Sequence, residues 1–161
     1  MKLTAAQLEE LRTDALRGAR HFKAAGKDVP PALLVYNARP DGRLGELHII
    51  ALMGGTKDQW AALQQKQARS PEVAAAVLVI ECWSLIQDRA AAALAAGAVP
   101  DSIAAHPGRT EALLVSVMTR EEQHIGFATI TGKAVAEFEL RPLSPDGPAR
   151  MTGRFVRESA R

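Results

Sequence analysis

The stretch VLVIECWSL, Val77 to Leu85, constrains the fold more than any other segment of the chain. It belongs to an apolar, β-branched run that predicts a strand over residues 75–84. Because successive side chains of a strand point to opposite faces, this segment divides into two rows. One row is Val77, Val79, Glu81 and Trp83, and the other is Leu78, Ile80 and Cys82. A carboxylate in so apolar a strand needs an explanation, since an unpaired buried charge is costly.

Capping residues and apolar spacing predict two helices. Thr4 and Gln7 match a capping box, and apolar residues then recur every three or four positions, which predicts a helix over 4–25. Thr56 can cap a second helix directly after Gly54 and Gly55, and Ser70-Pro71 ends that helix.

Five strands besides 75–84 are predicted. Residues 31–38 and 43–52 flank the turn Arg39-Pro40-Asp41-Gly42, and further strands are expected at 111–119, 123–131 and 133–141. The segment 86–110 has features of a loop with one or two helical turns, and the sequence leaves the choice open.

The predicted order is α-β-β-α-β-loop-β-β-β, without alternating βαβ units. Short turns between strands favour an α+β class, with one domain over residues 1–161 and a mostly antiparallel sheet. We expect the helices to pack on one face of this sheet. Residues 142–161 are expected to form a short edge strand or a mobile C-terminal tail.

The chain of 161 residues is 47% hydrophobic and 24% charged, as in globular domains, and has one cysteine. The N-terminus lacks the apolar core of a secretory signal, and the apolar run Ala74–Ile80 is too short to span a bilayer. These features predict a cytoplasmic location and no membrane partner.

Basic residues are concentrated at the ends of the chain. Residues 1–28 carry six Lys or Arg against four Asp or Glu, and residues 141–161 carry five against two. These excesses are small and no aromatic residues alternate with the bases, so solvated termini are favoured over a nucleic-acid partner.

Cys82 and Glu81 each allow more than one role. Cys82 continues a row of aliphatic side chains and is interpreted as a small core residue, with a thiolate nucleophile as the alternative. Glu81 faces solvent, pairs with a structural partner such as Arg109, or acts as a catalytic acid or base.

The four histidines, His21, His48, His106 and His124, have no metal-ligand spacing, and Gly54-Gly55-Thr56-Lys57 lacks the frame of a phosphate-binding loop. We therefore expect no metal site and no cofactor.

The segments VLVIECW and HPGRTEALLVSV, together spanning Val77 to Val117, resemble a pattern in small bacterial proteins without an established activity. There, a strand with Glu and Trp is followed by a His-Pro-x-Arg loop and another strand. The resemblance implies that Glu81, Trp83, His106 and Arg109 lie together, as a candidate pocket or a structural polar cluster.

Three functions follow from these patterns. The favoured hypothesis is a non-catalytic binding or interaction module that self-associates as a homo-oligomer, because apolar residues lie on both faces of some strands. The alternative is a small hydrolase-like enzyme with Glu81, His106 and Arg109 in one pocket. The third is a weak nucleic-acid binder that uses the basic termini.

Overall fold

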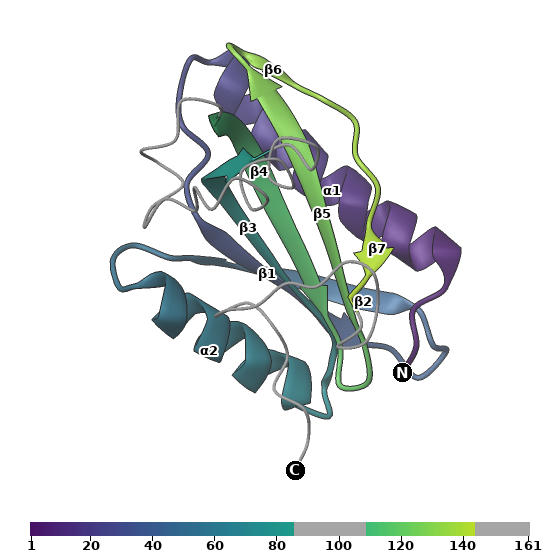
Figure 1. Ribbon diagram of the computed structural model, residues 1–161. Helices are drawn as coiled ribbons and strands as arrows, with labels where there is room; N and C mark the ends of the chain where they lie inside the picture. Colours follow the sequence, from purple (N-terminus) through teal and green to yellow (C-terminus); the bar gives the residue numbers. More distant parts are fainter. Residues whose placement is uncertain (86–108, 144–161) are drawn as a thin grey trace, which may run out of the picture.

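One antiparallel sheet organises the protein, as seen in a computed structural model that describes residues 1–85 and 109–143 (Figure 1). The elements described are α1 (Ala5–Ala24), β1 (Ala32–Ala38), β2 (Leu44–Ala51), α2 (Lys57–Arg69), β3 (Val73–Leu85), β4 (Arg109–Met118), β5 (Gln123–Thr131), β6 (Ala134–Val135) and β7 (Arg141–Pro142). The strand order is β2-β1-β3-β4-β5-β6, β7 also pairs with β5, and each pair is antiparallel. The predicted α+β class and element order are confirmed. Residues 86–108 of the expected 86–110 loop and residues 144–161 of the expected tail lie outside the described residues, and residues 109 and 110 already belong to β4.

Both predicted helix starts are correct. The Thr4 side chain accepts a hydrogen bond from the Gln7 backbone amide, and the Gln7 side chain accepts one from the Thr4 backbone amide. Thr56 and Gln59 form the same reciprocal box at the start of α2. Such caps satisfy amide groups that have no partner within the helix. The predicted hairpin is β1 and β2.

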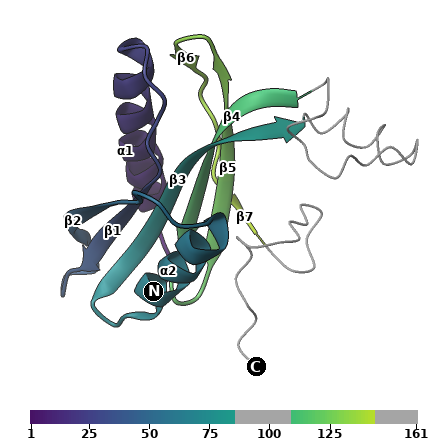
Figure 2. The same cartoon turned by 90° about the vertical axis from the view of Figure 1, so that its left-hand side faces the viewer.

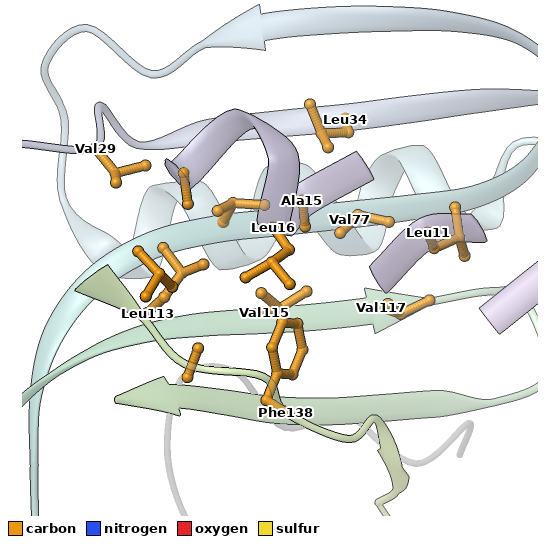
Figure 3. Close-up of a cluster of buried hydrophobic side chains, with 14 of the residues drawn as sticks. Leu11, Ala15, Leu16, Val29, Leu34, Val77, Leu113, Val115, Val117 and Phe138 are labelled. Carbon is orange, nitrogen blue, oxygen red and sulfur yellow. The ribbon is translucent and has the colours of Figure 1, made fainter. Parts of the chain in front are cut away.

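The two helices cover opposite faces of the sheet, so the expectation of one covered face is wrong. Val77 and Val79 of β3 pack in the core beneath α1, whereas Leu78 and Ile80 pack in the core beneath α2. Figure 2 shows the sheet between the helices, and Figure 3 shows the α1 core. The physical reason lies in β3, where every residue from Ala74 to Ile80 is buried. A strand that is apolar on both faces must be covered on both faces.

The predicted strand 133–141 is only partly correct. Its ends form β6 and β7 on β5, while residues 136–140 run opposite 126–129 outside regular strand geometry. Phe138 is buried directly over Gly126, where an added Cβ would lie 2.5 Å from the Phe138 ring. The packing of this ring against a residue without a side chain displaces the segment from a regular ladder.

Neither of the two described helices is both apolar enough and long enough to cross a lipid bilayer.

Candidate functional site

Glu81 lies near the end of β3 on the face covered by α1, and its side chain is 17% exposed. One carboxylate oxygen, Oε1, lies 2.7 Å from Lys23 Nζ and accepts a hydrogen bond of 2.8 Å from the Val29 backbone amide. Of the three roles left open by the sequence, the geometry therefore supports a mostly buried carboxylate with a structural partner.

Lys23, in the last turn of α1, is the centre of a larger group that we name the Lys23 cluster: Lys23, Asp28, Glu81 and Glu111. Its Nζ lies 3.2 Å from Glu111 and 3.6 Å from Asp28. Glu81 and Trp83 are two residues apart in β3 and therefore share a face of the sheet. The β3–β4 register places Glu111 opposite Trp83, so Glu111 lies on that same face and both acids face the end of α1. The cluster ties α1, the following loop and two strands together.

The pKa of Lys23 is raised above its ordinary value, chiefly by its hydrogen bond to Glu81 and further by Glu111, against the opposing effect of burial. The ammonium group therefore stays charged. The three carboxylates approach within 4.8 Å of one another, a spacing that suits a metal ion, but Lys23 already supplies a positive charge within 3.6 Å of each. The arrangement is that of an internal ion cluster.

The remaining predicted site residues are only partly placed. Trp83 lies two residues beyond Glu81 on the same face and is about half exposed. The backbone of Arg109 pairs with Leu85 at the start of β4, as expected for neighbouring strands, and its side chain lies outside the described residues, as does all of His106. The expected convergence of Glu81, His106 and Arg109 remains a prediction.

Cys82 faces α2, in the row that contains Leu78 and Ile80. Burial raises the pKa of its thiol, nearby Lys57 opposes this effect, and Glu81 adds to it. A raised pKa disfavours the thiolate, so the structure supports the interpretation of Cys82 as a core residue.

An open groove of about 500 Å³ lies between α1 and residues 137–140. Arg12 lines it and is paired with Glu9 and Glu137. The groove contains none of the predicted site residues.

Strand β2 presents a second candidate site, an open edge of the sheet. Two of its apolar side chains are exposed, Leu47 and Ile49, the latter at 67%, and Met53 just after the strand is 93% exposed. In the described part of the chain, β2 pairs with β1 alone and forms one end of the strand order. We name residues Leu47–Met53 the β2 edge.

The sequence identified the residues of β2 and their alternation but did not reveal this edge. Strand order depends on contacts between segments distant in the chain, so a hairpin pattern alone does not tell whether another strand follows β2 in space. The sequence also did not identify Lys23 as a site residue. It lies four residues after Ala19, which itself lies four residues after Ala15, and so falls on the buried stripe of α1.

No protein-family model matches this chain, and neither the curated proteins nor the solved structures contain a significant match to it.

Proposed function

We propose that this protein is a non-catalytic interaction module that self-associates through the β2 edge. The observation that carries the proposal is an eight-residue edge strand with exposed Leu47 and Ile49. An exposed, apolar edge strand is a template for pairing with another strand, and proteins that avoid such pairing protect it with lysine, proline or a covering segment.

In the part of the chain that the structure describes, the β2 edge lacks this protection. From Leu47 to Met53 it contains no lysine, arginine, aspartate, glutamate or proline. The bulge of β2 lies before this segment, between Leu44 and Leu47. Two copies can therefore approach at this edge without repulsion between like charges.

The hydrolase alternative has weaker support. Its proposed base, Glu81, already interacts with Lys23 and the Val29 amide, which favours a role in stability. The nucleic-acid alternative is also less favoured, because Arg12, Arg17 and Arg20 of α1 each lie in an ion pair with an acidic side chain. As expected from the sequence, we also propose that the protein is bacterial and acts in the cytoplasm.

Analytical ultracentrifugation over roughly 1 to 200 µM tests the proposal, a range that covers modest affinities. The native protein is expected to show a reversible monomer–dimer equilibrium, and Ile49→Lys is expected to be monomeric, because a charge on the edge opposes pairing. Ala134→Lys is the matched control, since it adds the same charge to exposed β6 at the other edge. A native protein that stays monomeric throughout, or equal dimerisation of Ile49→Lys, would contradict the proposal.

A further inference from the structure

We infer that the strand that pairs with β2 is β2 of a second copy, antiparallel and related by a twofold axis that passes beside Ile49. This inference rests on the proposed function and specifies the partner and the register. It follows from two features of the β2 edge, its apolar side chains and its backbone groups that have no partner among residues 1–85 and 109–143, and the positions of its charges are compatible with it.

The backbone determines which residues are able to pair. The Leu52 amide donates to the Pro31 carbonyl of the neighbouring chain segment at 3.0 Å, which continues the register of Ala51 opposite Ala32. In an antiparallel ladder, hydrogen-bonded pairs alternate with pairs whose amide and carbonyl groups point away. His48 and Ile50 therefore bond to β1, whereas Leu47, Ile49 and Ala51 direct their backbone groups outward.

The outward residues also carry the exposed apolar side chains. Leu47 and Ile49 lie opposite Tyr36 and Leu34, which belong to the α1 core, so all four share the α1 face of the sheet. Ile49 lies beyond the part of that face covered by α1 and remains 67% exposed. A strand added outside β2 would bring a second row of side chains beside this one, about 5 Å away.

Five twofold registers, with the axis at one of residues 47–51, preserve outward pairing, and their side-chain contacts differ. An axis at Leu47 places Ile49 opposite Gly45, and an axis at Ala51 places Leu47 opposite Gly55. An axis at Ile49 places Ile49 opposite itself and Leu47 opposite Ala51. An axis at His48 places Ala51 opposite Gly45, beside the bulge, and an axis at Ile50 places Leu47 opposite Met53, beyond the end of β2. Only the axis at Ile49 pairs all three outward residues with one another, which also gives both exposed strand residues an apolar neighbour across the interface.

The charges are compatible with this register. With the axis at Ile49, Glu46 lies opposite Leu52, and the two Glu46 side chains are at opposite ends of the interface. Six residue steps along the strand separate them, about 20 Å, which is beyond the screening length at physiological salt. An extended segment of another protein could also pair with the outward amides and carbonyls of β2. The apolar side chains of two β2 strands lie opposite one another in this register, which favours a second copy.

Disulfide trapping tests the register. Three single-cysteine proteins are made in a Cys82→Ser background: Leu47→Cys, Ile49→Cys and Ala51→Cys. In the inferred dimer, the two Cα atoms at position 49 lie about 5.5 Å apart, within the range for a disulfide. Two copies of position 47, or of position 51, lie about 14 Å apart and cannot be linked.

Under mild oxidation, Ile49→Cys is expected to form a covalent dimer at least tenfold faster than the other two proteins. A mixture of Leu47→Cys and Ala51→Cys is expected to form the mixed dimer faster than either protein links to itself. Ala134→Cys, on the opposite edge, reports the rate of random collision. Equal rates for Ile49→Cys and Ala134→Cys would overturn the inference.

The outcomes separate the inference from the proposed function. If ultracentrifugation detects a dimer that Ile49→Lys abolishes, but trapping is fastest at position 47 or 51, the register is wrong and self-association stands. If the fastest trapping occurs in a mixture of Ile49→Cys with Leu47→Cys or with Ala51→Cys, the axis lies at His48 or Ile50 and the register is again wrong. If trapping fails at all three positions and in these mixtures while that dimer persists, antiparallel β2 pairing is wrong. If the native protein is monomeric, both proposals fail, and pairing with another protein becomes the remaining use of the edge.

Discussion

The two edges of the sheet differ in how their backbone is protected. At one edge, β2 is eight residues long and exposes Leu47 and Ile49. At the other edge, β6 and β7 have two residues each, and residues 136–140 lie between them. Phe138 fastens this segment over Gly126, and Pro142 in β7 has no amide hydrogen to offer.

Charges reinforce this difference. Glu137, in the segment between β6 and β7, pairs with Arg12 and Arg20 of α1, and Arg141 of β7 pairs with Glu139. Short strands, proline and charged residues are the features by which proteins prevent edge-to-edge association. In the part of the chain that the structure describes, these features gather at one edge, whereas Leu47–Met53 at the other contain no charged residue and no proline. This contrast supports the proposal that the β2 edge pairs with another strand.

Loss of the Phe138 side chain is expected to have the largest effect on the protected edge. Phe138 is 8% exposed and contributes to the α1 core (Figure 3). Phe138→Ala is expected to lower the free energy of unfolding by about 3 kcal/mol, through lost burial and a cavity. Urea denaturation measures this loss, in an Ile49→Lys background so that association does not contribute.

Phe127→Ala is the control, because Phe127 lies on the neighbouring strand β5 and is 45% exposed. We expect it to cost about 1 kcal/mol, since less buried area is lost. Equal losses for the two substitutions would show that Phe138 does not fasten the segment.

A substitution in the Lys23 cluster separates folding stability from association. Lys23→Met leaves Glu81 mostly buried without its ion-pair partner and is expected to cost about 2–3 kcal/mol. The double variant Lys23→Met/Glu81→Gln is expected to recover part of this loss, because no buried charge remains. Both are measured by urea denaturation in the Ile49→Lys background.

Arg17→Met removes the same charge from an exposed position of α1 and is expected to cost less than 0.5 kcal/mol, or roughly the value of a surface pair. The otherwise native protein with Lys23→Met should still dimerise, because β1 lies between β2 and the strands β3 and β4 that carry Glu81 and Glu111. A loss of stability no greater than that of Arg17→Met would contradict the structural role of the cluster.

The smallest effect concerns His124, where β7 joins β5 at the protected edge. Its side chain is 6% exposed, and Nδ1 has no hydrogen-bond partner among the described residues. Burial lowers the pKa of His124, and nearby Glu122 opposes this effect. The unfolded chain thus binds a proton at a higher pH than the folded protein does.

The contribution of His124 to stability is therefore complete above its unfolded pKa of about 6.5 and declines as the pH falls below it. Between pH 7.5 and pH 5.5, His124→Gln is expected to lose less stability than the parent protein in thermal unfolding. If the two proteins lose the same stability, His124 does not titrate in the way its burial implies.

Local features of the sequence were sufficient to predict most of the elements. The capping residues Thr4 and Thr56 marked both helix starts, and the Pro40-Asp41-Gly42 turn marked the hairpin. The apolar run at Val77 correctly predicted β3, and the separate apolar run after Glu111 correctly predicted β4. These signals depend on residues near one another in the chain.

Contacts between distant residues were not predictable in the same way. The Lys23–Glu81 pair joins a helix to a strand, and Phe138 packs on Gly126 from another segment. Neither interaction has a local signature. The position of the helices, in contrast, was predictable from local sequence, although the expectation of one covered face was wrong. The unbroken apolar run in β3 already indicated that successive residues are buried and that both faces of the sheet are covered.

Hydrogen exchange at single amides of β2 tests the central claim most directly. The amides of His48 and Ile50 bond to β1 and are expected to exchange slowly at every protein concentration, which provides an internal control. The amides of Leu47, Ile49 and Ala51 are expected to exchange rapidly in dilute protein and at least tenfold more slowly in concentrated protein, where a second β2 covers them. Rapid exchange of these three amides at both concentrations would contradict pairing through the β2 edge.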